Sequence, residues 1–193
     1  MSDADLVARV RAGDGQAYRL LVDEHGRRVF RLAYRITCNE QDAEDVVQET
    51  FMKAYRRLEL YDSRAGFGSW LFRIATNCAL DLLRVRKRRG GGVEPAGLDD
   101  PGVPESAAAS GPAQDQRVFG VEVQEKVVRA MRRLSDGERA AFVLRHFEEK
   151  PVKEVARTLG QTDNATKQAL FRAVRKLRRE LEPERAGMRM VSR

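Results

Sequence analysis

The chain has 193 residues, enough for one ordinary domain or two small ones, and 34% of them are charged, with a net charge of +7. No apolar run approaches the roughly 20 residues of a membrane span, and the first residues, Met-Ser-Asp-Ala-Asp, are not those of a signal peptide, so we expect a cytoplasmic protein without a membrane span. Cys38 and Cys78 belong to no CxxC motif and have no histidine nearby, so we expect no metal and no cofactor.

Charged residues are distributed unevenly along the chain, and this distribution predicts two domains. Residues 1–89 carry 17 basic and 13 acidic side chains, residues 90–116 carry five acidic and no basic ones, and residues 117–193 carry 19 and 11. The middle segment also has four prolines and few large apolar groups, too few to offset the entropy of ordering it. We therefore predict a domain at 1–89, a disordered acidic linker at 90–116, a more basic domain at 117–182 and a flexible tail at 183–193.

Apolar residues recur at helical spacing through most of the chain, and no convincing strand pattern is present, so the predicted fold is all-α. The helix predicted to begin near Asp42 has one apolar stripe, formed by Val47, Phe51, Ala54 and Leu58. Asn39 can cap its first turn, where acidic residues also complement the helix dipole. Asp45, Gln48 and Glu49 form a polar, acidic cluster outside the stripe, which taken alone is typical of a solvated helix face.

A loop with two glycines follows, with the composition of a site that reads an unpaired base. Residues 61–69 read Tyr-Asp-Ser-Arg-Ala-Gly-Phe-Gly-Ser and lead directly into Trp70. They place aromatic and hydroxyl groups beside Arg64 and Arg73, and this chemistry can stack on and hold a flipped base. Simple core packing explains Trp70 equally well.

The helix after this loop combines core residues with a basic end. Leu71, Ile74 and Leu82 are expected in the core. Residues 84–89 read Arg-Val-Arg-Lys-Arg-Arg and are followed by glycine. The helix dipole accounts for part of this charge, but five basic residues in six exceed that need, so we predict contacts with DNA phosphates.

The C-terminal domain shows the pattern of a helix-turn-helix. Ser135-Asp-Gly-Glu138 is a capping box that predicts the start of one helix, and Pro151 separates that helix from a short one ending at Gly160. Thr162 caps a long helix that reaches about residue 181 and occupies the position of a recognition helix.

This long helix is predicted to bury one face and to offer the other to DNA. Its inward stripe consists of Leu170, Val174, Leu177 and Leu181. Residues 165–179 contain six basic side chains and no acidic one. Gln168 and Arg172 are candidate base readers, because glutamine and arginine make bidentate contacts with adenine and guanine, whereas the later basic residues suit phosphates.

Two blocks of the chain resemble the extracytoplasmic-function (ECF) branch of the bacterial sigma-70 family. Residues 13–89 are similar to the family's second conserved region, above all Asp-Ala-Glu-Asp-Val-Val-Gln-Glu-Thr-Phe at 42–51 and Phe-Gly-Ser-Trp-Leu-Phe-Arg-Ile-Ala-Thr-Asn at 67–77. Residues 118–181 are similar to its fourth region. The resemblance implies a sigma factor that binds core RNA polymerase, recognises the minus-10 and minus-35 promoter elements and helps to open the DNA. The resemblance also implies that the chain carries no catalytic residues of its own.

The resemblance also implies partners and contact residues. The implied partners are core RNA polymerase, through its β′ coiled coil and β flap, promoter DNA and, where one exists, an anti-sigma factor. The residues implied for polymerase are Asp45, Gln48, Glu49 and Phe51. Those implied for minus-10 DNA are Asp62, Ser63, Arg64, Phe67, Ser69, Trp70, Arg73, Asn77, Arg84, Arg86, Lys87 and Arg88. From the chemistry of the recognition helix, the residues predicted to contact minus-35 DNA are Lys167, Gln168, Arg172, Arg175, Lys176 and Arg179. Residues 161–167 and Ala169 depart from the family pattern, so the resemblance implies the fold there and no particular minus-35 sequence.

Two rival functions stay open at this point. A self-sufficient helix-turn-helix regulator would explain the second domain but would leave the acidic helix and the aromatic loop unexplained. A metal-dependent hydrolase would use the carboxylates of Asp42, Glu44, Asp45 and Glu49. Their helical spacing spreads them over too wide an arc for one metal site, and neither histidine sits in a ligand motif, which argues against this second rival.

Overall fold

The computed structural model describes residues 1–89 and 126–190, and the regular elements within these ranges are all helices. The predicted all-α fold class is therefore confirmed. The predicted linker at 90–116 lies outside the described residues, and so do the last three residues of the predicted tail. Among the described helices, none is both long and apolar enough to cross a membrane.

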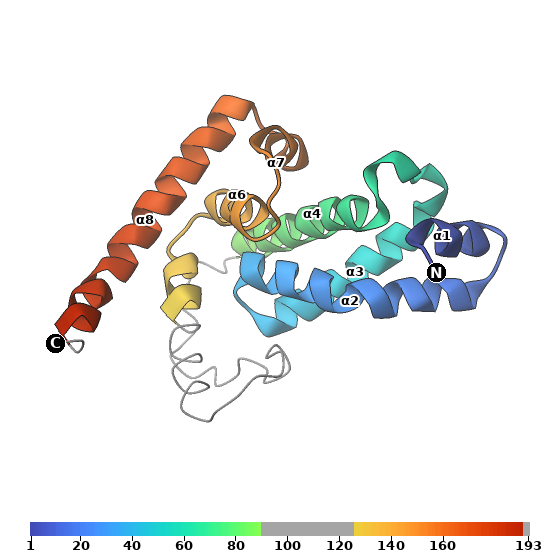
Figure 1. Cartoon of the computed structure of the whole chain (residues 1–193), viewed down its shortest axis with the longest axis horizontal. Coiled ribbons are helices and arrows are strands. Elements are labelled where there is room, and N and C mark those ends of the chain that lie inside the picture. The colour runs from blue at the N-terminus through green and yellow to red at the C-terminus, as the bar shows by residue number, and fades with distance from the viewer. Residues whose placement is uncertain (90–125, 191–193) are drawn as a thin grey trace, which may run out of the picture.

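The N-terminal domain is a bundle in which α2, α3 and α4 lie alongside one another, with α1 at one end (Figure 1). Its elements are α1 (Asp3–Arg11), α2 (Gly15–Thr37), α3 (Glu40–Arg56), α4 (Phe67–Arg88) and two short 3-10 turns, η1 (Leu58–Leu60) and η2 (Ser63–Ala65). The side chains of Leu21, Leu32, Ile36 and Leu71 are fully buried between the helices. Burial of these groups supplies the main stabilisation of the bundle.

Helix α3 begins as predicted but buries a wider face than predicted. The side-chain oxygen of Asn39 accepts a hydrogen bond from the amide of Asp42 at 2.8 Å, which confirms the expected cap. Val46 is fully buried and Val47 only half-buried, because α3 packs against both α2 and α4. Asp45 and Gln48 lie outside this contact and are exposed.

The C-terminal domain has the predicted helix-turn-helix. A helical segment at 126–132 precedes α6 (Asp136–His146), α7 (Val152–Leu159) and α8 (Asp163–Met190). The capping box of Ser135 and Glu138 is present, and Gly160 ends α7 in the left-handed conformation with φ 62°. The Thr162 hydroxyl accepts a hydrogen bond from the amide of Ala165 at 3.2 Å, so the cap of the recognition helix is also confirmed.

The two domains pack against each other, which the sequence did not indicate. Helix α6 packs against α2 and α4, and α7 packs against α4, so buried side chains of both domains form one continuous core. The buried guanidinium of Arg139 donates a hydrogen bond to the carbonyl of Ile36, and Arg132 donates one to the carbonyl of Cys38 at 3.0 Å. These carbonyls stand at the C-terminal end of α2, where a helix has free acceptors and partial negative charge.

Candidate functional site

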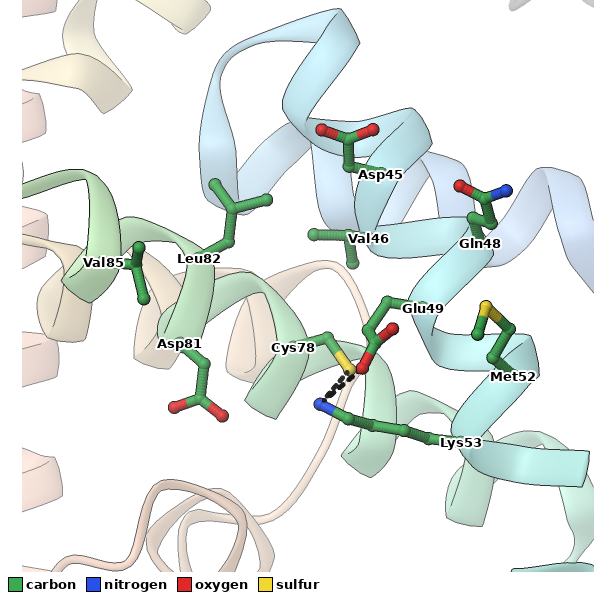
Figure 2. Close-up of a pocket in the computed structure, with 10 residues that line it drawn as sticks. All are labelled: Asp45, Val46, Gln48, Glu49, Met52, Lys53, Cys78, Asp81, Leu82 and Val85. Atoms are coloured by element: carbon green, nitrogen blue, oxygen red, sulfur yellow. Dashed lines mark hydrogen bonds and ion pairs between the residues drawn. The ribbon is translucent and has the colours of Figure 1, made fainter. Parts of the chain in front are cut away.

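A groove between α3 and α4 carries the acidic residues that the sequence singles out (Figure 2). It has a volume of about 370 Å³ and is called the α3–α4 groove below. Its apolar part comes from Val46, Leu82 and Val85, and its acidic part from Asp45, Glu49 and Asp81, with Gln48, Met52, Lys53 and Cys78 completing the lining. Leu82 is thus a half-buried groove residue, whereas Leu71 and Ile74 are buried as predicted.

The acidic residues of the groove differ in how they are held. The Nζ atom of Lys53 lies 3.1 Å from Oε1 of Glu49 and 3.6 Å from Sγ of Cys78 (Figure 2). Burial raises the pKa of the Cys78 thiol, although Lys53 opposes the shift, so this thiol is not activated. Asp45 and Met52 are both exposed. Acidic side chains around an apolar floor are the surface that a basic, partly apolar helix fits.

Phe51 does not belong to the surface of the groove. Its side chain is 7% exposed and packs edge-on to the ring of Tyr18 on α2, with 6.5 Å between ring centroids. A side chain this buried offers almost no area to a partner. We therefore assign Phe51 to the support of α3 and leave it out of the contact surface.

The loop at 61–69 is built on an aromatic cluster. Phe67 is 1% exposed and contacts the rings of Tyr61, Trp70 and His25 at 5.6, 5.6 and 5.2 Å between centroids. Trp70 is half-buried in this cluster. The structure therefore places Phe67 in the core, where it shapes the loop without facing solvent. Of the aromatic residues in the predicted base site, Trp70 retains an exposed part.

Arg11, which the sequence reasoning missed, ties the loop to α1. It donates hydrogen bonds to the carbonyls of Leu58 and Tyr61 at 2.7 and 2.8 Å. No local pattern marks this role, since the partners lie about fifty positions further along the chain. Asp62 accepts a hydrogen bond from Nε of Arg64 at 2.7 Å, so these two predicted DNA contacts are paired with each other, and Ser63 lies exposed between them.

A second pocket, called the loop pocket below, lies at the start of α4. It has a volume of about 300 Å³, and its lining includes His25, Arg28, Gly68 and Ser69 from the N-terminal domain. Gly66, with φ 68°, leads into α4 without a side-chain cap. His25 is buried, its Nε2 lies 3.1 Å from Asp3, and its Nδ1 has no hydrogen-bond partner among the described atoms.

The polar face and basic end of α4 are exposed, and some of the residues are ion-paired. Arg73 and Asn77 lie one turn apart on its surface. Arg84 pairs with Asp81 at 2.9 Å, and Arg86 pairs with Asp42 at 2.8 Å. Lys87 and Arg88 are exposed at the end of the helix, where they can reach phosphates.

Glu138 organises the basic side of the recognition helix. Its carboxylate, 6% exposed, accepts hydrogen bonds from Nε of Arg172 at 3.0 Å and from Nζ of Lys176 at 2.7 Å. Burial alone would raise the pKa of Glu138, but the bonds from Lys176, the Ser135 amide and Arg172 outweigh it and lower that pKa. Arg172 uses Nε for this bond, so Glu138 holds the side chain of a candidate base reader in place.

The buried stripe of α8 is displaced from the predicted one. Thr166, Ala169, Ala173 and Leu177 are buried, whereas Leu170, Val174 and Leu181 are half-buried. Ala169 is therefore part of the buried face of α8, the helix that packs onto α6 and α7. Lys167, Gln168 and Arg175 are exposed as predicted, and so is Phe171, at 65%, which the sequence reasoning did not select.

We expect Glu138→Gln to lower the free energy of unfolding by about 1–2 kcal/mol near neutral pH, because it weakens two charge-assisted hydrogen bonds. The folded pKa of Glu138 lies below its unfolded value, so the contribution is present above about pH 4.5 and is lost as the pH falls through the folded pKa. Denaturant titrations of both proteins over a pH series measure this. Glu180→Gln, at an exposed position of α8, is the control. A difference in the free energy of unfolding between wild type and Glu138→Gln that stays constant into acid would contradict the assignment.

The carboxylates considered for a metal site lie in other contacts. Asp42 is held by Arg86 and Glu49 by Lys53, while Glu44 and Asp45 are exposed. Within residues 1–89 and 126–190, no group of three His, Cys, Asp or Glu side chains is placed to hold a metal ion. Cys38 and Cys78 are buried free thiols.

Comparisons with known proteins agree with the two-domain division. The family model of Sigma-70 region 2 matches residues 21–89, and that of Sigma-70, region 4 matches residues 124–177. The chain is 29% identical over 178 residues to the ECF RNA polymerase sigma factor SigW of Bacillus subtilis, covering 91% of this chain and 94% of the relative. It is 30% identical over 182 residues to the RNA polymerase sigma-H factor of Pseudomonas aeruginosa, covering 94% of each. The solved structure of CnrH in complex with the cytosolic domain of CnrY superposes with a TM-score of 0.62 at 26% identity, covering 95% of this chain and 99% of that one.

Proposed function

Because the chain belongs to the ECF branch of the sigma-70 family and is a sigma factor for transcription initiation, we propose that the surfaces described above divide that work between them. The observation that carries the proposal is one of position. The region 2 match contains the acidic α3–α4 groove and most of the lining of the loop pocket, and the region 4 match contains a basic helix-turn-helix. The site of action is then the bacterial cytoplasm, where polymerase meets promoters.

The α3–α4 groove is the proposed docking surface for core RNA polymerase. Asp45, Gln48 and Glu49 would contact the β′ coiled coil, with Met52 and Leu82 as the apolar part of the surface. Charge complementarity of this kind raises the rate of encounter and selects the partner. The C-terminal domain would contact the β flap. The proposal also includes an anti-sigma factor that covers these surfaces, because CnrH was solved in complex with the cytosolic domain of CnrY.

The loop at 61–69 and the adjoining end of α4 form the proposed minus-10 site. Ser69 and the exposed part of Trp70 would receive a flipped base, and Arg73 and Asn77 would line the path of the strand. Phe67 would not contact the base itself, and its buried ring would support the shape of the loop. Arg84, Arg86, Lys87 and Arg88 would contact phosphates, with Arg86 leaving Asp42 to do so.

The exposed face of α8 is the proposed minus-35 site. Gln168 and Arg172 would read base edges, with Glu138 holding Arg172 in position, and Phe171 would contact a thymine methyl group. Lys167, Arg175, Lys176 and Arg179 would contact phosphates.

We expect Arg172→Ala to change the base preference of DNA binding and Arg179→Ala to change its overall affinity. Arg172→Ala should relax the preference at one or two minus-35 positions, at a cost of about 1–3 kcal/mol for the preferred base. Arg179, whose side chain is 80% exposed, should act uniformly, so that its removal weakens every promoter and lowers the salt slope by about one contact. Affinities for a set of single-base promoter variants at several salt concentrations separate the two. The same loss across all variants for both mutants would contradict base reading by Arg172.

Transcription from a random promoter library with purified core polymerase tests the function as a whole. The expected result is polymerase-dependent enrichment of promoters with two common elements. An electrophoretic shift with the chain alone discriminates the rival, because a self-sufficient regulator would bind duplex DNA tightly without polymerase. Tight, sequence-selective binding of the chain alone, with no stimulation of polymerase, would favour that regulator.

A further inference from the structure

Helix α1, which lies outside the residues matched by the region 2 family model, holds the loop at 61–69 at its start. Nη2 of Arg11 donates hydrogen bonds to the carbonyls of Leu58 and Tyr61 at 2.7 and 2.8 Å, and it lies 3.3 Å from the carbonyl of Glu59. The turn η1 ends here, and carbonyls at the end of a helical turn accept bonds from side chains. One guanidinium therefore fixes the backbone from which the loop begins.

At the other end of the loop, α1 acts through His25 on α2. A carboxylate oxygen of Asp3 lies 3.1 Å from Nε2 of His25, whose side chain is buried. The ring of His25 lies 5.2 Å from the ring of Phe67, and a Cβ added to Gly68 would lie 3.6 Å from Cε1 of His25. Asp3 thus orients a buried ring that supports the residues at which the loop enters α4.

Between these two ends, the loop is held by its own aromatic rings. The ring of Tyr61 lies 5.6 Å from that of Phe67 and 5.2 Å from that of Trp70. Arg11 binds the carbonyl of Tyr61, so it fixes the residue whose ring packs against Trp70. Trp70 and Ser69 are the residues proposed to receive the flipped base. A shift of the backbone that Arg11 holds would therefore move the support of the proposed base site.

We propose that α1 is a positioning element for the loop at 61–69, with Arg11 and Asp3 as the positioning residues, and that it sets how sharply the minus-10 base is selected. The consequence for base selection rests on the proposed function, whereas the hold of α1 on the loop is a property of the chain alone. Hydrogen bonds to a base require a fixed loop, because they weaken steeply when donor and acceptor are misaligned. Helix α1 is itself anchored by a capping box at Ser2 and by the buried side chains of Leu6 and Val7.

The test uses the full chain and removes the two contacts separately. Arg11→Met removes the bonds to the loop carbonyls and keeps the apolar stem, whereas Arg11→Lys keeps one donor group. Asp3→Asn removes the charge that faces His25. The control is Arg9→Met, which removes an ion pair of the same helix at 2.6 Å whose partner, Asp14, lies outside the loop.

Two measurements follow the loop and its function separately. Acrylamide quenching of the fluorescence of Trp70, the single tryptophan of the chain, measures the exposure of the loop in the free protein. Open-complex formation by polymerase that carries each variant, on promoters that differ at single minus-10 positions, measures the base preference. Circular dichroism verifies that each variant is folded.

We expect Arg11→Met to raise the quenching constant of Trp70 about twofold and to reduce the preference for the favoured minus-10 base about three- to tenfold, because a less fixed loop spends less time in the selective geometry. Arg11→Lys should fall between Arg11→Met and wild type in both measurements. Asp3→Asn should change both in the same direction and by less, because Asp3 acts through His25. Arg9→Met should match wild type.

The outcomes separate this positioning role from the proposed function. Wild-type quenching in both Arg11→Met and Asp3→Asn would overturn the hold of α1 on the loop. Raised quenching with an unchanged base preference would overturn the positioning role. An equal loss of preference in Arg9→Met would assign the effect to general destabilisation of α1, which also overturns the proposal. If quenching responds as expected but polymerase carrying the wild-type chain shows no minus-10 preference, α1 still holds the loop and the assignment of base capture to that loop falls.

Discussion

Reversing the charge of Asp45 and Glu49 together, to lysine, is expected to weaken binding to core RNA polymerase by about 30- to 1000-fold. Each charge-assisted contact is worth roughly 1–3 kcal/mol, and the two together about 2–4 kcal/mol after partial compensation by salt and solvent. Asp45 should contribute more, because Glu49 is already paired with Lys53 at 3.1 Å and must exchange one partner for another. Fluorescence anisotropy of labelled chain with purified core enzyme measures the change.

The control for this reversal is Asp23→Lys with Glu24→Lys. These two acids are exposed on α2, outside the α3–α4 groove, and the double change alters net charge by the same amount. The control should bind polymerase within about threefold of wild type, a difference of well under 1 kcal/mol, and both variants should keep their helical circular dichroism. Equal losses of polymerase affinity in the two double variants would mean that binding depends only on net charge. An unchanged affinity in the variant with Asp45 and Glu49 reversed would place docking elsewhere.

Phe67→Ala is expected to lower the free energy of unfolding by about 3–5 kcal/mol, because it empties the centre of the aromatic cluster of Tyr61, Trp70 and His25. For a domain of this size that is a large part of the total stability. Denaturant unfolding followed by circular dichroism measures the loss. Any defect of this variant in promoter opening then arises through folding, and a loss below about 1 kcal/mol would contradict the buried placement.

Ser69→Ala is the matched variant that separates base capture from folding. Ser69 is half-buried and its hydroxyl accepts a single hydrogen bond, from Nζ of Lys150, so the stability should change by less than about 1 kcal/mol. Promoter opening, followed by permanganate reactivity of unpaired thymines, should nevertheless decline, with an altered base preference in the minus-10 element. Wild-type opening and preference in this variant would place base capture at other residues of the loop.

The shared helix α4 connects the two ends of the N-terminal domain. The α3–α4 groove uses its second half, through Cys78, Asp81, Leu82 and Val85, and the loop pocket uses its first turn. Arg86 on the same helix is clamped to Asp42 at the start of α3.

The amino-acid sequence by itself determined the all-α fold class and the starts of α3, α6 and α8, whereas α8 runs to Met190, beyond its predicted end near residue 181. Caps at Asn39, Ser135, Gly160 and Thr162 are local interactions between residues three or four positions apart, so the local sequence specifies them without reference to tertiary contacts. The exposure of Asp45 and Gln48 follows equally from spacing, because they fall outside the apolar stripe of their own helix.

Only the tertiary structure decided what the aromatic and basic residues do. A phenylalanine can stack on a base or fill a core with the same chemistry, and packing against Tyr18 and His25 put Phe51 and Phe67 in the core. An arginine can bind a phosphate or a carboxylate, and it was the fold that brought Glu138 to Arg172 and the end of α2 to Arg139. Such partners lie tens of residues apart, so their pairing depends on how the helices pack. Residue type and local spacing do not predict that packing.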